Sequence, residues 1–554
     1  MNLENLDWYI IFGYLILLIS LSSYLSKDQK NAKDYFVASR KQKSKNLAVS
    51  ILATQCSTNS ILGAPAFVAF SVGGGLSWLF YELAVPLSMI IIMIFLFPVF
   101  YRLKIISIYE YLEKRFDLKT RLLMSALFLF VRVFATGVIV YSVSIVIELI
   151  TGLSFVYSVL TLGLITIIYD ILGGIKAIIY SDIIQMIILT SVLTFVLFYL
   201  IDIFGNFSSM FHLFSEERNI EINFSHHGFG DGNDFAFWPM LIGGFFLYLS
   251  YYGCDQSQMQ KGLCSVSQEE GQKVFFLNGI FRFPLVLLYC LIGVGIGSYS
   301  ELNSNFISSL PILDGNPNFN LAVPIFLIEN LPTGIVGLTL VALFAAAMSS
   351  LDSVLNSLSA VTMEDFIKRK KNLVYLSEKK GLLLSRVVTL FWGLLAVLLA
   401  FYVEEVSSNV LIAINKIGSL INGPIIGVFL LGVLTTKVNG NSACTGIICG
   451  FLCNLFCWMY LDNVSWLWWN VIGFIITFKM ALIHDYFFYN YESNKTFVWS
   501  MKLLYKSGFK YFSKHFGEGF VKLSSSNSKK WIIINKQTVP HATLEQVCKL
   551  INIE

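Results

Sequence analysis

Charged residues are scarce in this sequence. Asp, Glu, Lys and Arg make up 13% of the 554 residues, whereas hydrophobic residues make up 56%. The mean hydropathy is +0.69, and apolar runs near the length of about 20 residues that a helix needs to cross a bilayer recur along the chain. This composition excludes a water-soluble enzyme and predicts an all-α polytopic membrane protein.

Motifs for several kinds of chemistry are also missing. No G-x-x-x-x-G-K-[ST] loop is present, so the sequence offers no ATP site of this kind. The apolar spans offer no histidine placed for a catalytic pair, which ranks an intramembrane hydrolase last. The cysteines form no CxxC pair, and they are interpreted as small hydrophobic residues rather than disulfides or metal ligands. Those in or beside apolar runs are Cys56, Cys254, Cys264, Cys290, Cys444, Cys449, Cys453 and Cys457.

The apolar runs predict about thirteen transmembrane helices. They lie near residues 8–26, 46–70, 77–100, 121–150, 153–173, 179–203, 236–260, 274–298, 334–360, 381–402, 408–435, 442–461 and 466–485. The first run follows acidic residues and lacks a basic leader or a cleavage site, so we expect a retained helix rather than a signal peptide.

Basic residues gather in segments 27–45, 102–121 and 368–371, after the first, third and ninth spans. These segments fall on one side if every span crosses once, and the opposite loop 298–332 contains no Lys or Arg. The positive-inside rule therefore places the N-terminus outside and the C-terminus in the cytoplasm of a cell (plasma or inner) membrane.

Two spans are interrupted by residues that break helices. In 46–70, polar residues run into Gly63-Ala64-Pro65, and Pro65 lacks a backbone donor, so we expect unwinding there. Five spans later, Gly253 lies among tyrosines, glutamines and Asp255. Matched breaks an odd number of spans apart predict inverted repeats around a binding site near the membrane midplane.

The breaks and loops divide the chain into six segments. We expect an extra helix with a basic loop at 1–45, a first repeat at 46–203 and an external loop at 204–235. A second repeat at 236–435, two additional helices at 436–490 and a cytoplasmic tail at 491–554 would follow. The tail is too short for a kinase or other large effector domain.

The span around 341–359 carries unusual polarity for membrane depth. Ala346, Ser349, Ser350 and Ser353 follow i, i+3, i+4 and i+7 spacing and share one helical face, with Asp352 at its border. Small residues let another backbone approach, and hydroxyls offer oxygen ligands. Simple helix packing is the alternative, but packing alone does not require a carboxylate at membrane depth.

Several motifs together resemble the sodium:solute symporter family, which includes sodium–glucose, iodide and sialic acid transporters. The resemblance covers residues 7–485. The motifs are DYFVASR at 34–40, ILATQCSTNSILGAPAF at 51–67, ILGGIKAIIYSDIIQ at 171–185, SYYGCDQSQMQK at 250–261 and AAAMSSLDSVLNSLSAVTMEDF at 345–366. The resemblance implies a five-plus-five inverted-repeat, leucine-transporter-like fold, with one helix before the ten-helix core and two after it.

The resemblance also implies where sodium, the coupling ion, would bind. The common sodium site would use carbonyls of Ala53, Cys56 and Ala346 and hydroxyls of Ser349 and Ser350. Some members hold a second sodium, whose ligands here would be Ser57, Asp182, Asp352 and Ser353; Asp352 departs from the hydroxyl residues usual at its position. Two unpaired carboxylates in a small volume repel, so we expect a sodium between them or a proton on one of them.

Substrate would sit between the first, second, third, sixth and tenth core helices. The candidates are Gln55, Thr58, Ser60, Glu82, Arg132, Tyr248, Tyr251, Tyr252 and Lys416. Tyr251 matches an aromatic ring that closes the site from the cytoplasmic side in glucose-type members. Arg132 matches an arginine that binds a carboxylate in sialic-acid-type members, which favours an anionic substrate. The alternatives are a structural ion pair of Arg132 with Glu82 or Asp170, and a Lys416 that snorkels.

We therefore predict a sodium-coupled secondary active symporter, not an enzyme, that imports a small carboxylate or sugar acid such as sialic acid. Its partners would be that solute, sodium and the lipid bilayer, with no nucleic acid. A symporter for a neutral sugar and a proton-coupled version are the nearer alternatives, because Asp182 and Asp352 could titrate. A transporter-like membrane sensor is a more distant one.

Overall fold

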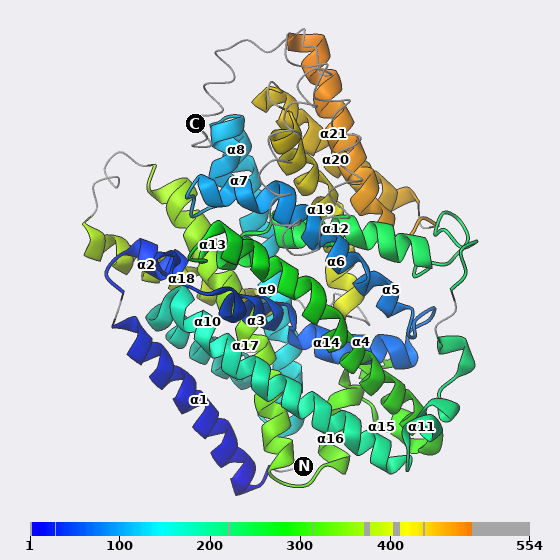
Figure 1. The fold of residues 1–554 in the computed structure, drawn as a ribbon. Coiled ribbons are helices and arrows are strands. Elements are labelled where there is room, and N and C mark those ends of the chain that lie inside the picture. Colours follow the sequence, from blue (N-terminus) through cyan, green and yellow to red (C-terminus); the bar gives the residue numbers. More distant parts are fainter. Residues whose placement is uncertain are drawn as a thin grey trace.

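A computed structural model describes residues 3–27, 29–219, 222–313, 315–369, 377–402, 410–435, 438–461 and 463–489. The predicted tail at 491–554 lies outside these residues. The described chain is an assembly of helices, with one short antiparallel hairpin of β1 (Ile312–Leu313) and β2 (Asn316–Pro317) (Figure 1). Its eight described cysteines are all free thiols.

The first part of the chain forms eleven α-helices with one 3₁₀ turn and one π turn among them. They are α1 (Asn5–Ser26), α2 (Ala32–Val37), η1 (Ala38–Arg40), α3 (Ser44–Gln55), α4 (Thr58–Phe70), α5 (Trp78–Glu82), α6 (Ala84–Ile91), η2 (Ile92–Leu96), α7 (Phe97–Arg102), α8 (Tyr109–Arg115), α9 (Leu118–Thr151), α10 (Phe155–Ile203) and α11 (Phe207–Leu213). A 3₁₀ turn, η3 (Glu216–Arg218), follows them.

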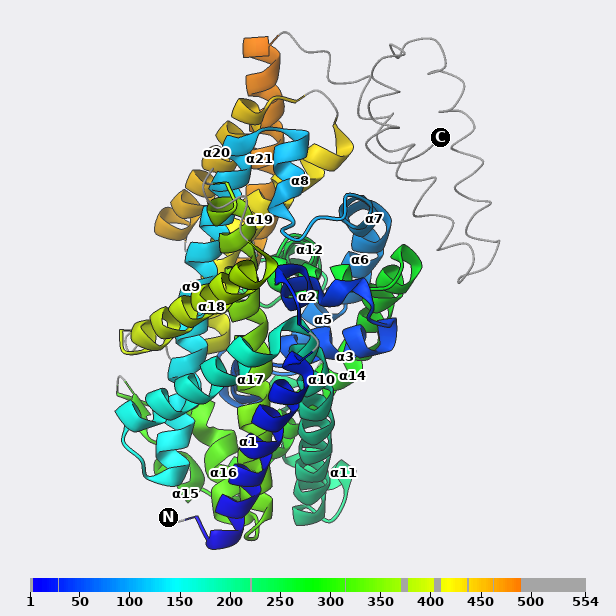
Figure 2. The ribbon, with the colours of Figure 1, turned by 90° about the vertical axis from the view of Figure 1, so that its left-hand side faces the viewer.

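The second part repeats the pattern of a broken helix followed by long ones. Its elements are η4 (Pro239–Gly243), α12 (Gly244–Gly253), α13 (Gln256–Leu263), α14 (Gln268–Leu302), α15 (Asn305–Ser309), η5 (Phe319–Leu321), α16 (Ala322–Asn330), α17 (Ile335–Val361), η6 (Thr362–Ile367), α18 (Glu378–Ala400), α19 (Val410–Leu434), α20 (Gly440–Tyr460) and α21 (Leu467–Tyr489). Figure 2 shows α20 and α21 beside α19, at the end of the molecule away from α15 and α16.

Ten helical segments of the described residues are long and apolar enough to cross a membrane. One of them, α10, is divided at Gly174, whose φ of +55° and ψ of −171° are not helical. A Cβ at this position would lie 2.7 Å from the Tyr35 ring, so the kink also needs a glycine for space. Two shorter apolar helices are also present among the described residues, Thr58–Phe70 of the broken α3–α4 segment and Phe319–Asn330, and the number of crossings stays a prediction.

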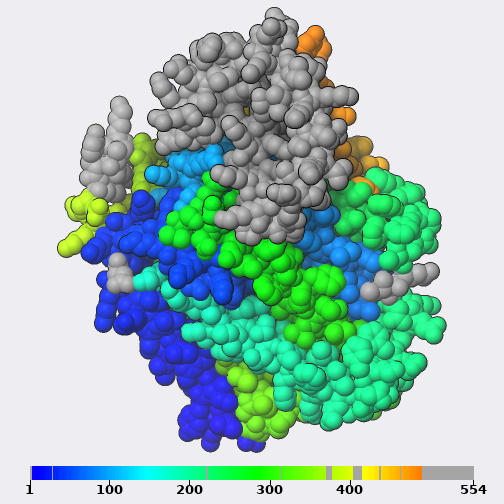
Figure 3. Space-filling model, in the orientation of Figure 1, coloured from blue at the N-terminus to red at the C-terminus, as the bar shows by residue number. Residues whose placement is uncertain are grey.

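The helix α17 lies at the centre of the fold. In its most apolar stretch 89% of residues are buried, against 22% for α1. It packs against α1, α3, α9, α10, α13 and α18, whereas the side chains of α1 form one outer edge of the molecule (Figure 3). The serine-rich face predicted for this span is therefore enclosed by protein and not by lipid.

Both predicted helix breaks are present, but the first lies elsewhere than expected. The chain leaves helical geometry at Cys56 and Ser57, between α3 and α4, and Pro65 lies inside α4. The prediction of unwinding at Gly63–Pro65 is thus wrong. Pro65 is the eighth residue of α4, so its missing donor leaves the Ile61 carbonyl without an N–H partner four residues on, but the helix continues to Phe70. The second break falls at Cys254 and Asp255, as the position of Gly253 predicted.

Polar contacts join the basic loops at one end of the molecule. Arg40 donates from Nη2 to the carbonyl of Ile105 at 2.8 Å, and Arg121 pairs with Glu113 at 2.6 Å. Arg369 also pairs with Glu113. Partial burial raises the pKa of Glu113 and the two guanidinium groups lower it, with a net shift downward. The segments after the first, third and ninth spans therefore meet, as their charge predicted.

The other end of α17 is capped from α1. The Oδ1 atom of Asp7 accepts hydrogen bonds from the N–H groups of Gly334 at 2.8 Å and Gly337 at 2.7 Å. A carboxylate satisfies the free donors at a helix N-terminus and complements its dipole. The extra N-terminal helix is thus tied directly to the central helix of the core.

Candidate functional site

The break between α3 and α4 leaves carbonyls without backbone partners, because the last carbonyls of a helix have no N–H four residues on. Hydroxyls of α17 fill this gap. Ser349 Oγ donates to Ala53 O at 3.0 Å, and Ser350 Oγ donates to Thr54 O at 2.7 Å. Both hydroxyls also lie within 3.2 Å of Ala346 O. Three carbonyl and two hydroxyl oxygens thus converge between the two helices.

This cluster suits a sodium ion, which takes several hard oxygen ligands. Four of the five residues predicted for the common site are in it: Ala53, Ala346, Ser349 and Ser350. The fifth, Cys56, is fully buried at the end of α3, where its N–H donates to Leu52 O at 3.0 Å. The Thr54 carbonyl is an additional oxygen that sequence reasoning did not single out.

The residues predicted for a second sodium are arranged differently from the expectation. Asp182 is not an unpaired carboxylate: its Oδ2 accepts from Lys261 Nζ at 2.7 Å and from Ser50 Oγ at 2.5 Å. Both Asp182 and Lys261 are fully buried. The expectation that Asp182 is an unpaired carboxylate is therefore wrong, because Lys261 of α13 contacts α10 and supplies the partner.

Asp352 also has partners. Its Oδ2 accepts from the Tyr169 hydroxyl, and its Oδ1 accepts from Ser353 Oγ at 3.1 Å. Ser353 is in turn 2.9 Å from Thr54 Oγ1. Ser57, the remaining residue predicted for the second site, precedes α4 and lines the cavity described next.

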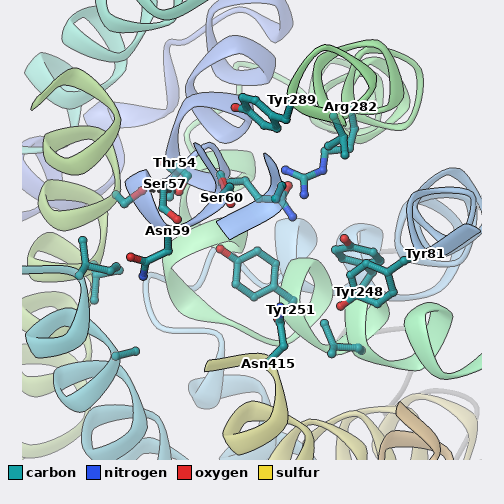
Figure 4. A pocket seen from close by; sticks show the side chains of 18 of the residues that line it. Thr54, Ser57, Asn59, Ser60, Tyr81, Tyr248, Tyr251, Arg282, Tyr289 and Asn415 are labelled. Carbon is teal, nitrogen blue, oxygen red and sulfur yellow. Dashed lines mark hydrogen bonds between the residues drawn. The ribbon is translucent and has the colours of Figure 1, made fainter. Parts of the chain in front are cut away.

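A cavity of about 130 Å³ opens beside the break, between α4, α9, α12 and α14. Five of the nine predicted substrate residues line it: Gln55, Ser60, Arg132, Tyr248 and Tyr251. Figure 4 shows Tyr251 among the labelled residues, with Ser60 and Asn59 of α4 on one side and the Tyr81–Tyr248 pair on the other. The lining combines amide and hydroxyl groups with aromatic faces, as expected for a small polar organic ligand.

Arg132 reaches the cavity from α9 and is paired with neither Glu82 nor Asp170, the partners weighed from sequence. Its Nε donates to Asp255 Oδ2 at 2.5 Å, and its guanidinium carbon lies 5.0 Å from the centre of the Tyr251 ring. Nη1 and Nη2 have no hydrogen-bond partner among the described residues. Asp255 is also the N-cap of α13, since its Oδ1 accepts from Ser257 N. The arginine is therefore tied to the second helix break.

A second arginine, Arg282 of α14, was missed by sequence reasoning. It forms two hydrogen bonds with Glu82, at 2.9 and 3.2 Å, and its Nη1 is buried without a partner among the described residues. Glu82 is fully buried and also accepts from the Tyr248 hydroxyl at 2.7 Å. An arginine in the middle of an apolar span was the available signal, because charges at that depth are costly.

The other predicted substrate residues are not in the cavity wall. Thr58 is buried and donates to Leu343 O at 3.2 Å, and Glu82 lies behind Tyr248. Tyr252 is fully buried behind the wall. Lys416 is exposed, with Nζ 5.7 Å from the centre of the Trp469 ring, and its neighbour Asn415 lines the cavity instead.

Comparisons with known proteins agree with this architecture. Residues 35–450 match the sodium:solute symporter family. The sodium-dependent multivitamin transporter of Oryctolagus cuniculus is 31% identical over 457 residues, 80% of this chain and 69% of that protein. The sodium/sialic acid symporter NanT of Aliivibrio fischeri is 28% identical over 447 residues, 80% of this chain and 86% of that protein.

One solved structure shows the fold. A Na⁺-coupled sialic acid symporter in a substrate-bound, outward-open state aligns with a TM-score of 0.78 at 24% identity, over 88% of this chain and 98% of that one. This likeness confirms the predicted inverted-repeat, leucine-transporter-like fold.

Proposed function

This chain belongs to the sodium:solute symporter family, whose members are multi-pass membrane transporters and not enzymes, and we propose that it imports a small organic anion with sodium. The anion would be a carboxylate or a sugar acid such as sialic acid. The observation that carries the proposal is the cluster of five oxygens where α17 meets the broken α3–α4 segment.

Sodium at this cluster would couple binding to conformation. A cation there joins the carbonyls of α3 to the hydroxyls of α17. It therefore favours the conformation in which these two sets of oxygens face each other. A ligand shifts a conformational equilibrium only by its differential affinity for the two states. We expect sodium to favour the outward-open state, and substrate then to permit closure and inward release.

The cavity supports a sugar acid in three ways. Arg132 and Arg282 bring guanidinium groups to the cavity wall, and Nη1 of Arg282 is buried without a partner in the described part of the chain, so these groups can bind a carboxylate. The N-terminus of α4 lies at the cavity and favours negative charge. Ser60, Asn59 and the tyrosine rings offer hydrogen bonds and flat faces for a hydroxylated ring.

A neutral sugar is the second candidate, and one observation favours it. Each arginine is already paired with a carboxylate, Arg132 with Asp255 and Arg282 with Glu82. The two pairs carry no net charge, so a neutral polyol could bind through the same nitrogens and carboxylate oxygens without an ionic partner.

The orientation follows from the basic loops. We propose an extracellular N-terminus and a cytoplasmic C-terminus, with the protein in the plasma or inner membrane, because the joined segments that contain Arg40, Arg121 and Arg369 are rich in positive charge. The repeat boundaries at 46–203 and 236–435 are part of the same proposal, since each encloses one broken helix near its start.

Uptake into proteoliposomes containing the purified full-length protein tests the proposal. Each sugar acid is compared with the neutral sugar of the same ring, under an inward sodium gradient, a potassium gradient and a proton gradient. We expect sodium-driven accumulation of the acid above its neutral partner. Preference for the neutral sugar would select the second candidate, and uptake driven by protons alone would contradict sodium coupling. Failure to transport any solute under every gradient would favour a sensor.

A further inference from the structure

A lysine ammonium occupies a site built from oxygens, one turn from the proposed sodium site. Lys261 Nζ donates to Ser50 O at 2.9 Å, to Asp182 Oδ2 at 2.7 Å and to the Thr54 hydroxyl. A carbonyl, a carboxylate and a hydroxyl are the oxygen types that bind a monovalent cation. An ammonium has three N–H donors, so all three are used here.

The surroundings of this ammonium include two of the four residues expected to hold a second sodium. Asp182 belonged to that set and is a direct partner of Lys261. Ser353 belonged to it as well, and its hydroxyl lies 2.9 Å from Thr54 Oγ1, which accepts from Lys261. The charged nitrogen therefore contacts one expected ligand directly and is linked to another through the Thr54 hydroxyl.

We infer that the ammonium of Lys261 takes the place of a second coupling sodium, so that this transporter moves one sodium per solute. The inference rests on the proposed function. Both Lys261 and Asp182 have fully buried side chains, and a cation beside a buried carboxylate offsets the cost of burying its charge. A lysine supplies that charge permanently, whereas a sodium would have to bind and leave in every cycle.

The position also links the resident charge to the moving parts. Lys261 is on α13, after the second helix break, Asp182 is on α10, and Ser50 and Thr54 are on α3. The Thr54 hydroxyl touches Ser349 O at 3.2 Å, next to the proposed sodium ligands. With one sodium per cycle, transport of a monoanion would be electroneutral, and transport of a neutral solute would move one positive charge.

The test measures the sodium order of uptake in proteoliposomes, well below saturating sodium. In the wild type we expect first-order behaviour, so that tenfold less sodium lowers uptake about tenfold. Lys261→Ala opens the space and leaves the carboxylate, so a second sodium should enter and tenfold less sodium should lower uptake about a hundredfold. Lys261→Arg keeps the charge and should stay first order.

A stability measurement covers the case in which Lys261→Ala folds poorly. Its melting temperature should rise more steeply with sodium than that of the wild type, because sodium then replaces the lost charge. The double variant Asp182→Asn/Lys261→Ala removes both charges and should lose this extra dependence.

Three results would overturn the inference. The first is second-order sodium dependence in the wild type that Asp182→Asn reduces to first order. The second is a Lys261→Ala protein that transports with first-order dependence. The third is a Lys261→Ala protein that sodium stabilises no more than it stabilises the wild type. Uptake by the wild type that does not respond to sodium at all would instead contradict the proposed function.

Discussion

Replacing Ser350 by alanine removes one hydroxyl from the proposed sodium site and little else. The side chain is 3% exposed, and its oxygen bonds the carbonyls of Thr54 at 2.7 Å and Ala346 at 3.2 Å. Without sodium, the variant leaves a buried carbonyl short of one hydrogen bond, worth about 1 kcal/mol. With sodium, it leaves the ion with four of its five oxygens.

The loss of one neutral ligand should weaken sodium binding by about 1.4 kcal/mol, or tenfold. The sodium concentration for half-maximal uptake should therefore rise about tenfold, with a maximal rate near that of the wild type once sodium saturates. Sodium-dependent uptake in proteoliposomes measures both quantities.

Ser357→Ala is a matched control for this variant. Ser357 is a fully buried serine of the same helix, and its hydroxyl bonds Val354 O at 2.8 Å within that helix. It should leave the sodium dependence unchanged. If Ser349→Ala and Ser350→Ala both keep the wild-type sodium dependence while folding normally, the oxygen cluster is a packing contact and the sodium site lies elsewhere.

Three further predictions concern the cavity. Arg132→Lys should raise the half-saturating concentration of an anionic solute about tenfold, because the fork is lost while the charge facing Asp255 remains; equal uptake kinetics in the variant would remove Arg132 from the substrate site. Tyr251→Ala should let preloaded solute leak out and loosen coupling, whereas Tyr251→Phe should be milder because the ring remains; efflux assays in which both variants behave alike would make the ring ordinary packing. Arg282→Gln leaves Glu82 buried without its cation and should destabilise the protein by about 3–5 kcal/mol; adding Glu82→Gln should restore much of the melting temperature, and a double variant as unstable as the single one would contradict the ion-pair argument.

Helix breaks show how far local sequence could specify the fold. The second break followed from Gly253 and the polar residues around it, and it lies where the sequence predicted. The first was placed at Gly63–Pro65 because proline removes a donor. The structure breaks the helix at Cys56 instead, where α17 offers hydroxyls to the freed carbonyls. The location of that break depends on a partner almost 300 residues away in the chain, at a separation of 296.

The candidate site likewise has one part that local sequence indicated and another part that depends on distant partners. The spacing of Ser349 and Ser350 on one helical face, together with the family motifs, pointed to four of the five residues whose oxygens form the cluster. The fifth, Thr54, became apparent only in the structure. The ion pairs were not accessible, because Asp182 and Lys261 are 79 residues apart, Arg132 and Asp255 are 123 apart, and Glu82 and Arg282 are 200 apart.

By itself the sequence determined the features that depend on neighbours in the chain: membrane residence, the helical spans, the basic loops, the serine face and the presence of two broken helices. These follow from hydropathy and helical periodicity, which are local properties. Tertiary structure alone decided which buried charge meets which, since that depends on how distant helices pack. It placed Lys261 beside Asp182, where the sequence had suggested a sodium, and it placed Arg282 in the wall of the cavity.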